Sequence, residues 1–274
     1  TETQSPGKSK RTTEESTDEQ AREVLAETVV TDTTYSDGHI SVVLTTYREN
    51  DTTIHVADVT LSSAEYLKTA FADGTYGKNI TDTTSGMAED NGAILAVNGD
   101  YYGMQEEGYV IRGGVLYRST VKEDAQDLVI YANGSFEVIC EEDISAEELL
   151  KNGAWDVLSF GPGLVVDGEL NVDTDDEVDR AKTSNPRTAI GVIDELHYVF
   201  VVADGRNDES EGLSLYELAQ FMQELGCTTA YNLDGGGSST MVFNGKVIND
   251  PSGSSSRRNL SGERSVSDIV YIGY

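Results

Sequence analysis

Runs of apolar residues along this chain predict more β-strands than helices. Residues 39–48, HISVVLTTYR, and 52–61, TTIHVADVTL, are rich in strand-forming residues on either side of a short turn, which predicts an antiparallel pair. Residues 93–98, AILAVN, form a continuous apolar run that is typical of a central strand buried on both faces. Residues 187–206, RTAIGVIDELHYVFVVADGR, predict a second strand pair with a turn near its middle.

Further strands are predicted around turn sequences in the rest of the chain. Residues 127–140 and 240–248 each contain an Asn-Gly turn between apolar runs, which is typical of a hairpin. Strand character resumes in residues 155–170 around a Gly-Pro-Gly break, and it returns in residues 228–234 and 263–274.

Helical patterns are fewer. Residues 214–227, SLYELAQFMQELGC, carry one apolar stripe behind a capping box of Ser214 and Glu217. Residues 62–74 carry a capping box and a glycine stop and predict another helix, and residues 145–148 predict the start of a short acidic one. Because strands outnumber helices and mix with them, the predicted fold class is α+β, with mixed twisted β-sheets and flanking helices.

The first 34 residues differ in composition from the rest. Residues 1–20 contain almost nothing apolar, which predicts a disordered tether, and a short helix is predicted from about Glu19 to Glu27. Residues 35–274 show no second linker, so we predict one domain there. Thr1 is not an initiator methionine. We therefore expect that a leader or anchor segment precedes residue 1. The acidic, cysteine-poor composition and the tether further suggest a bacterial extracellular or cell-surface protein, anchored through that segment.

Charge and cysteine content exclude several classes of protein. Nineteen basic and forty-nine acidic residues give a net charge of −30, which argues against binding of nucleic acid or of an anionic membrane. An anionic substrate would need a local cluster of arginines. No apolar stretch approaches the roughly 18 residues of a membrane span. Cys140 and Cys227 could form a disulfide, but two unpaired buried thiols are favoured, and a zinc site is not expected.

Polar residues of similar kind follow several predicted strands. Asn98 ends one strand, Asp204 follows another, and Asp234 follows a third with Asn232 two residues earlier. Arg187 begins the strand RTAIGV. An Asp-Gly pair is by itself a common turn. A capped helix joins the segments of Asp204 and Asp234, however, and parallel strands in such a unit would place both aspartates at one edge of the sheet.

Three glycines and two serines follow Asp234 in the sequence NLDGGGSST. The backbone amides of Gly235, Gly236 and Gly237, with the hydroxyl of Ser238, could form a nest that binds an anion. The pattern is neither a Walker loop nor a dinucleotide fingerprint.

Arginines and a possible metal offer two further interpretations of these strand ends. Arg187, Arg206 and Arg264 fall in or beside the motifs and could bind phosphate oxygens in a bidentate manner, although surface ion pairs are the ordinary alternative. Oxygens of Asp204, Asp234 and Asn232 could instead hold calcium or magnesium. We predict no cofactor and keep the metal as the lesser alternative.

Taken together, the motifs resemble the phosphodiester glycosidase family over roughly residues 85 to 274. One departure is Asp100, where the family more often has glycine. The motifs that carry the resemblance are NGDYY, RTAIG, VVADGR with GLSLYELAQFMQELGC, NLDGGGSSTM and ERSVSD. The resemblance implies a hydrolase that cleaves a sugar-1-phosphodiester, such as an α-N-acetylglucosamine-1-phosphodiester, at C1–O. It also implies a carbohydrate phosphodiester as partner and, as in bacterial relatives, a role in exopolysaccharide or cell-wall polymers.

Under this resemblance each candidate residue receives a role. Asp234 would be nucleophile or general base, with Asp204 as its partner. The three arginines, the glycine amides and Ser238 would hold phosphate, and Asn98 and Asn232 would bind sugar hydroxyls or position the carboxylates. An alternative of another class is a non-catalytic cell-wall or carbohydrate-binding module that stacks sugars on Tyr101, Tyr102 and Tyr109.

Overall fold

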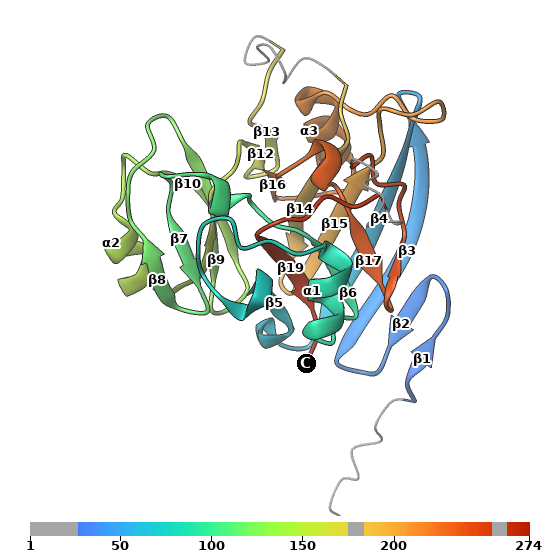
Figure 1. Cartoon of the computed structure of the whole chain (residues 1–274), viewed down its shortest axis with the longest axis horizontal. Coiled ribbons are helices and arrows are strands. Elements are labelled where there is room, and N and C mark those ends of the chain that lie inside the picture. Colours follow the sequence, from blue (N-terminus) through green and yellow to red (C-terminus); the bar gives the residue numbers. More distant parts are fainter. Residues whose placement is uncertain (1–26, 175–183, 254–261) are drawn as a thin grey trace, which may run out of the picture.

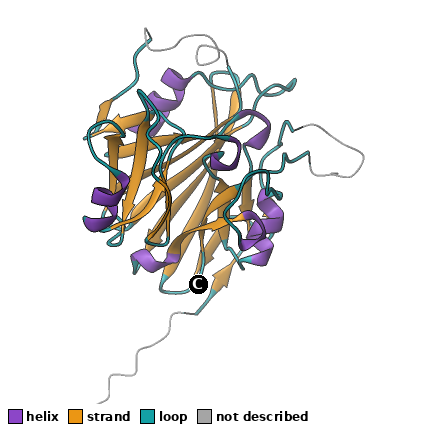
Figure 2. Ribbon diagram, turned by 60° about the vertical axis from the view of Figure 1, so that its left-hand side comes forward, coloured by secondary structure: helices purple, strands orange, loops and turns teal. Residues whose placement is uncertain are grey.

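Three β-sheets form the framework of the described part of the chain, with short helices on the outside (Figure 1, Figure 2). The computed structural model describes residues 27–174, 184–253 and 262–274. The predicted tether of residues 1–20 lies outside these ranges, as does almost all of the helix predicted from Glu19 to Glu27. One short strand, Val29–Val30, precedes the domain boundary that we predicted at residue 35, and a second, Thr34–Ser36, spans it.

Sheet 1 has nine strands in the order β1-β2-β3-β4-β15-β14-β16-β12-β13. These strands are β1 (Val29–Val30), β2 (Thr34–Ser36), β3 (Ile40–Glu49), β4 (Thr52–Leu61), β15 (His197–Ala203), β14 (Arg187–Asp194), β16 (Thr229–Leu233), β12 (Gly163–Val166) and β13 (Glu169–Leu170). The predicted pairs β3–β4 and β14–β15 are confirmed as antiparallel.

Two five-stranded sheets complete the structure. Sheet 2 contains β10 (Phe136–Cys140), β9 (Gln126–Tyr131), β11 (Ala154–Leu158), β7 (Val110–Arg112) and β8 (Val115–Arg118), in that spatial order. Sheet 3 contains β18 (Lys246–Val247), β17 (Met241–Phe243), β6 (Leu95–Asn98), β19 (Asp268–Ile272) and β5 (Leu67–Phe71). The apolar run before Asn98 is thus the central strand of sheet 3, as its composition predicts.

The helices are short. The α-helices are α1 (Thr84–Asp90), α2 (Ala146–Lys151) and α3 (Leu215–Glu224), and the 3-10 turns are η1 (Ala64–Tyr66), η2 (Ala72–Gly74), η3 (Tyr102–Met104) and η5 (Gly236–Ser238). The capping box of Ser214 and Glu217 is confirmed at α3, and Ser145 caps α2. Among the described helices, none has both the length and the apolar composition that a membrane span needs.

The main core lies between sheets 1 and 3 and continues to the inner face of sheet 2. It includes Val59 and Phe200 of sheet 1, Leu95 and Val270 of sheet 3, and Leu128 of sheet 2. A second core lies between the opposite face of sheet 1 and α3. Burial of this apolar surface supplies the dominant favourable term for folding, and it fixes the three sheets against one another.

The prediction of a helix over residues 62–74 is wrong. Ser63 caps the single turn η1, and the chain then continues as β5, which pairs with β19 along its whole length. Pairing at the edge of sheet 3 satisfies the backbone of this segment and buries Leu67. A capping box fixes only the first turn of a helix, so the tertiary pairing decides the rest.

The cysteines form no disulfide: Cys140 is exposed and Cys227 is buried, each as a free thiol. The disulfide alternative is therefore wrong, and the prediction of buried thiols holds for Cys227 alone. Burial raises the pKa of the Cys227 thiol to about 12.

The topology of sheet 1 brings the predicted strand ends together. Both β15 and β16 are antiparallel to β14, which lies between them. These two strands therefore run in the same direction and end at the same edge of the sheet, where β14 begins. Asp204 and Asp234 follow them, and Arg187 is the first residue of β14. The condition set by the sequence, parallel strands joined by a helix, is confirmed.

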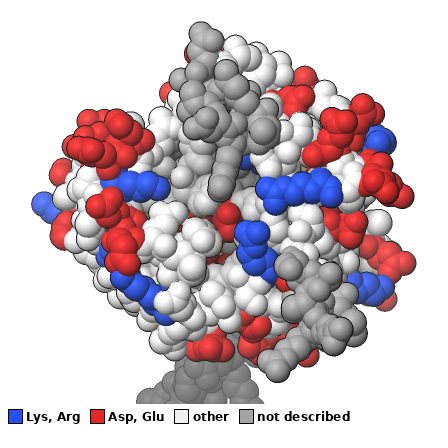
Figure 3. Space-filling view, turned by 45° about the horizontal axis from the view of Figure 1, so that its top comes forward, with Lys and Arg blue, Asp and Glu red and all other residues white. Residues whose placement is uncertain are grey.

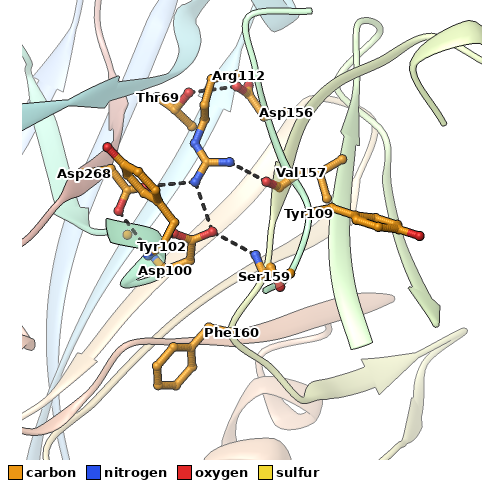
Figure 4. A network of polar contacts seen from close by, with 12 residues as sticks. Thr69, Asp100, Tyr102, Tyr109, Arg112, Asp156, Val157, Ser159, Phe160 and Asp268 are labelled. Atoms are coloured by element: carbon orange, nitrogen blue, oxygen red, sulfur yellow. Dashed lines mark hydrogen bonds and ion pairs between the residues drawn. The ribbon is translucent and has the colours of Figure 1, made fainter. Parts of the chain in front are cut away.

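A buried arginine connects sheet 2 with sheet 3 (Figure 4). Arg112, at the end of β7, donates through Nη2 to Asp100 Oδ2 at 3.0 Å and to Asp268 Oδ2 at 2.8 Å. Its Nη1 donates to the carbonyl groups of Val157 and Ile111. Asp100 and Asp268 are completely buried. Burial and the adjacent Asp100 carboxylate raise the pKa of Asp268 to about 7.

This network also holds two loops near the strand ends. Asp100 Oδ2 accepts a hydrogen bond from the Ser159 amide at 2.8 Å, and Asp100 Oδ1 accepts one from the Tyr102 amide at 3.1 Å. Asp268 Oδ1 accepts a hydrogen bond from the amide of Asp100. The departure from the family pattern at Asp100 thus has a structural explanation, since its carboxylate helps to neutralise Arg112.

Arg112→Met is expected to destabilise the protein by about 3–5 kcal/mol at pH 8, because two buried carboxylates lose their counter-ion. Without the guanidinium, the folded-state pKa of Asp268 rises further above its unfolded value. Stability is then lost as pH rises and recovers as pH falls, so the deficit should shrink toward pH 4. Urea unfolding at several pH values measures this.

Arg48→Met, at an exposed position on β3, is the matched control, with an expected effect below about 1 kcal/mol. Equal losses in the two variants, or a deficit for Arg112→Met that grows toward acid pH, would contradict the role of the network.

Candidate active site

A pocket of about 700 Å³ opens at the edge of sheet 1 where β15 and β16 end. In Figure 3, which brings the top of Figure 1 forward, basic side chains border a hollow near the middle of the face. Its lining residues are Phe160, Gly161, Asn185, Arg187, Arg206, Leu215, Asn232, Asp234, Gly235, Gly236 and Arg264. Three arginines and one carboxylate therefore meet in a cavity of the size that small-molecule sites usually have.

Asp234 is the carboxylate of this pocket. Its amide donates to the Gly99 carbonyl at 3.2 Å, and its own carbonyl accepts a hydrogen bond from Asn98 Nδ2 at 2.6 Å, so its backbone is fixed against sheet 3. Within the described chain, its Oδ2 is buried without a hydrogen-bond partner. Burial raises the pKa of Asp234, while a hydrogen bond from Ser238, the charge of Arg264 and the Gly235 amide act in the opposite direction.

The two asparagines have different functions in the structure. Asn98 is completely buried, and its Oδ1 accepts hydrogen bonds from Thr188 Oγ1 and the Thr240 amide. It therefore positions Asp234 and does not line the pocket. Asn232 lines the pocket and donates through Nδ2 to the Gly161 carbonyl at 2.8 Å. Its Oδ1 is buried without a partner among the described residues and can accept a hydrogen bond from a ligand hydroxyl.

The glycine run has a steric explanation. A Cβ at Gly235 would lie 2.8 Å from the Pro186 carbonyl oxygen. A Cβ at Gly236 would lie 3.2 Å from Arg206 Nη1, and one at Gly237 would lie 2.8 Å from Arg264 Nη2. The distances at Gly235 and Gly237 are shorter than real Cβ contacts, and Gly236 combines a tight contact with a φ of 62°, which favours glycine. The three glycines therefore let one carbonyl group and two guanidinium groups lie directly against the turn.

This arrangement changes the predicted anion nest. The Gly236 amide donates to the Pro186 carbonyl at 2.8 Å, and the Gly235 amide is hydrogen-bonded to the Asp234 carboxylate. Ser238 is completely buried and bonds to the same carboxylate. These groups hold Asp234 and the turn, so the positive charge that faces a ligand comes from the arginines.

The three arginines come from different segments. Arg187 is nearly buried and donates from Nε to the Leu213 carbonyl at 2.8 Å. Arg206 is exposed, with a backbone φ of 61°, and donates to Asn185 Oδ1 at 2.6 Å. Arg264 is exposed, and its Nη1 lies 3.5 Å from Ser238 Oγ. Guanidinium groups on several sides of one cavity suit a phosphate group.

Asp204 does not line this pocket, although the strand before it, β15, ends at the same sheet edge. His55 Nε2 lies 3.1 Å from its Oδ2, and Asn249 Nδ2 and the Asp250 amide donate to its Oδ1 at 3.1 and 3.0 Å. These partners occupy both oxygens, so Asp204 holds the 249–250 loop. Gly205 beside it is required because a Cβ would lie 2.8 Å from the Pro186 nitrogen.

The calcium or magnesium alternative fits these residues poorly. Both oxygens of Asp204 accept hydrogen bonds, which leaves Asp234 Oδ2 and Asn232 Oδ1 as the side-chain acceptors of the pocket that lack a partner in the described chain. Calcium requires about six to eight oxygens. Across the described ranges, no three His, Cys, Asp or Glu side chains gather as a metal site.

The binding-module alternative predicted a sugar-stacking surface of Tyr101, Tyr102 and Tyr109. This prediction is wrong for two of the three residues. Tyr102 and Tyr109 are each 1% exposed, and the Tyr109 hydroxyl donates to the carbonyl groups of Glu141 and Ile144. They are packing residues of the interior. Tyr101 remains partly exposed.

The structure adds pocket residues that the sequence analysis missed. Phe160 precedes the Gly-Pro-Gly break that Gly161 begins, Asn185 precedes Pro186, and Leu215 begins α3. The break and the helix start were visible in the sequence, but no local signal placed them at the end of β16.

Gly237→Ala is expected to weaken binding of inorganic phosphate about tenfold or more, because the added Cβ displaces the Arg264 guanidinium and a charge-assisted contact is worth about 1.5–3 kcal/mol. Isothermal titration calorimetry measures the affinity, and circular dichroism checks the fold. Gly77→Ala is the matched control, since its Cβ would meet only the end of the Ile80 side chain outside this pocket. Unchanged phosphate affinity in Gly237→Ala would contradict the assignment of Arg264.

Residues 91–273 match the sequence profile of the family described as phosphodiester glycosidase. N-acetylglucosamine-1-phosphodiester alpha-N-acetylglucosaminidase of Mus musculus is 28% identical over 207 residues, which are 69% of this chain and 39% of that protein. The SPbeta prophage-derived uncharacterized protein YomE of Bacillus subtilis (strain 168) is 29% identical over 204 residues, 73% of this chain and 31% of that protein. The chain thus spans less than two fifths of these relatives.

Solved structures agree with this fold. The catalytic domain of zebrafish N-acetylglucosamine-1-phosphodiester alpha-N-acetylglucosaminidase, auto-inhibited by its pro-peptide, superposes with a TM-score of 0.67 at 21% identity, covering 86% of this chain and 83% of that one. A hypothetical protein from Synechocystis gives 0.58 at 16% identity, with coverages of 85% and 62%. The predicted α+β class is confirmed.

The profile match runs from the residues just before β6 to the end of β19 and includes every residue of the pocket. It thereby confirms the resemblance that the strand-end motifs suggested. This chain belongs to the phosphodiester glycosidase family.

Proposed function

We propose that this protein hydrolyses a sugar-1-phosphodiester at the bond between C1 of the sugar and the phosphate oxygen, and releases the free sugar. The observation that carries the proposal is one carboxylate, Asp234, whose Oδ2 is buried without a partner in the described chain, in a pocket with three arginines. The mouse relative is named for an N-acetylglucosamine-1-phosphodiester. We take an α-N-acetylglucosamine-1-phosphodiester as the first substrate to test.

The arginines supply the binding energy for the phosphate. The guanidinium groups of Arg187, Arg206 and Arg264 line one cavity in a chain whose net charge is −30. That overall charge repels an anion, so a phosphodiester must be bound by this local cluster. Bidentate contacts to the non-bridging oxygens would also orient the scissile bond.

The leaving group explains why one carboxylate is enough. As the C1–O bond breaks, its electron pair stays on the phosphate oxygen, which is a weak base and needs little help from a general acid. Water adds its oxygen to C1 and gives one proton to Asp234. Among the described residues that line the pocket, Asp234 is the one carboxylate. It therefore acts as general base, and its charge stabilises the oxocarbenium-like centre.

The environment of Asp234 suits this role. Burial raises the pKa of its carboxyl, which makes it a better proton acceptor than an exposed aspartate. The partners Ser238 and Gly235 limit that rise and hold the carboxylate in place. Direct attack by an activated water inverts C1, so an α-linked substrate gives the β-sugar as first product. A substrate of this kind in an exopolysaccharide or wall polymer fits the proposed location outside the cell.

Asp234→Asn is expected to lower kcat by about 10²–10⁴-fold, because the amide cannot accept the water proton. Release of reducing sugar from an α-N-acetylglucosamine-1-phosphodiester measures turnover. In the wild type, activity should fall as pH drops through the raised pKa of Asp234, since the base becomes protonated.

Asp204→Asn is the matched control, because Asp204 lies outside the pocket lining and holds a neighbouring loop. Near-normal turnover in Asp234→Asn would remove this carboxylate from the mechanism. Wild-type binding of the diester without any hydrolysis would instead support a binding module.

A further inference from the structure

A cavity of about 610 Å³ lies between sheet 2 and the edge of sheet 3, away from the active-site pocket. Its walls come from β5, from the turn between β9 and β10, from β11, and from the turn between β14 and β15. Within the described chain, the two cavities have no lining residue in common. Its volume lies in the range of small-molecule sites.

The strand β14 separates this cavity from the active-site pocket. Arg187, its first residue, lines the active-site pocket, whereas Leu196, in the turn after it, lines the second cavity. β14 has eight residues, and an antiparallel strand rises about 3.4 Å per residue, so the two cavities lie roughly 25 Å apart. One phosphodiester group therefore cannot occupy both.

We propose that this cavity is a second binding site, and that its ligand is a neutral oligosaccharide. In this site one sugar ring lies against the indole of Trp155, and a hydroxyl group of the sugar donates to the carboxylate of Asp156. The inference concerns binding alone and does not depend on the proposed hydrolysis.

Trp155, in β11, gives the cavity a fixed aromatic surface. It is the one tryptophan in the sequence, and it is 47% exposed. A Cβ at Gly114 would lie 3.1 Å from its Cζ3, and the Gly114 amide donates to its carbonyl at 2.8 Å, so the ring is held against the turn between β7 and β8. An indole offers a flat apolar face and one N–H donor, which match the C–H face and the hydroxyl groups of a sugar ring.

Asp156, the next residue, provides an independent sign of a ligand. It is 1% exposed and lines the cavity. Its Oδ1 accepts hydrogen bonds from Thr69 Oγ1 at 2.7 Å (Figure 4) and from the Gly113 amide at 3.0 Å. Its Oδ2 receives no donor from the described chain. Because an unmade hydrogen bond to a buried charged group is costly, Oδ2 requires a donor from a ligand.

Asn133 places a donor at the same cavity. Its Oδ1 accepts hydrogen bonds from the Ser135 amide at 3.0 Å and from Ser135 Oγ at 2.7 Å, so its Nδ2 is the group that can donate to a ligand. Tyr198 Oη donates to the Gly134 carbonyl at 2.8 Å and anchors this turn to sheet 1. The cavity thus presents an acceptor and a donor on fixed elements, as recognition of hydroxyl groups requires.

The charges of the lining favour a neutral ligand. Its charged side chains in the described chain are Glu65, Lys68 and Asp156. The excess of acid here, and in the chain as a whole, repels an anion. The ammonium group of Lys68 disfavours a cation in the same space. A neutral sugar can instead use Lys68 as a donor and Asp156 as an acceptor.

Fluorescence of Trp155 tests the inference directly, because the sequence contains no other tryptophan. Maltose, cellobiose and N,N′-diacetylchitobiose are titrated separately into the whole protein. At least one of them should give a saturable change with a Kd in the millimolar range or tighter. No saturable change with any of the three would overturn the inference.

Two variants locate the bound sugar. Asp156→Asn keeps an oxygen acceptor for Thr69 and Gly113 but replaces Oδ2 by an amide, and it should weaken binding about tenfold or more. Trp155→Ala, measured by isothermal titration calorimetry, should lose binding, and circular dichroism checks that both variants fold. Tyr117→Ala, an exposed tyrosine outside the cavity, is the control and should bind as the wild type does. Wild-type affinity in Trp155→Ala would overturn the inference.

A matched pair of disaccharides tests the charge of the ligand. Chitobiose, which carries two ammonium groups, differs from N,N′-diacetylchitobiose by the loss of both acetyl groups. The acetylated, neutral sugar should bind more tightly. Equal or tighter binding of the diamine would overturn the assignment of a neutral ligand.

Inorganic phosphate separates this site from the proposed function. Saturating phosphate, which occupies the active-site pocket, should leave the disaccharide affinity unchanged, and a competitive loss would overturn the inference. Trp155→Ala should hydrolyse the methyl diester of α-N-acetylglucosamine-1-phosphate at the wild-type rate. Disaccharide binding at Trp155 in a protein that hydrolyses no diester would overturn the proposed function and support this site. Hydrolysis without disaccharide binding would overturn this site alone.

Discussion

The buried charge of Arg112 is the constraint on which the active-site geometry depends. A guanidinium group inside the protein is stable only where charged and hydrogen-bonding partners surround it, and Asp100 and Asp268 supply two carboxylates from the end of β6 and the start of β19. Sheet 2 and sheet 3 therefore meet in one register. Because Asp100 also accepts the amides of Ser159 and Tyr102, the same network fixes one wall of the pocket and the turn beside it (Figure 4).

The glycine turn solves a problem of space and charge together. Guanidinium groups from distant segments must approach one carboxylate closely without neutralising it by direct ion pairing. A turn without side chains admits Arg206 and Arg264 against its backbone, while Asp234 takes its hydrogen bonds from the turn itself. The carboxylate keeps one oxygen, Oδ2, for chemistry, as far as the described residues show. The three glycines are intrinsically flexible, but the turn that they form is fixed because neighbouring groups contact it closely.

Much of this site could be predicted from the sequence because the signals are local. Strand runs, capping boxes and an alternation of strand and helix were enough to place Asp234, Arg187 and Arg206 at one sheet edge. The different environment of Asp204 was not predictable, because its partners His55 and Asn249 lie 149 and 45 residues away in the chain. The same reason applies to residues 62–74, where the capping signal gave only a single 3-10 turn capped by Ser63 and the pairing with β19 decided the rest. Spacing predicts which residues share an edge, whereas side-chain packing decides which of them face the ligand.

The central claim is that this pocket cleaves a phosphodiester at carbon and not at phosphorus. Hydrolysis in water enriched in ¹⁸O, followed by mass spectrometry of both products, tests it most directly. Attack on C1 places the label in the released sugar and leaves the phosphomonoester unlabelled. Label in the phosphomonoester would mean attack at phosphorus, and Asp234 and the arginines could then not have the roles proposed for them.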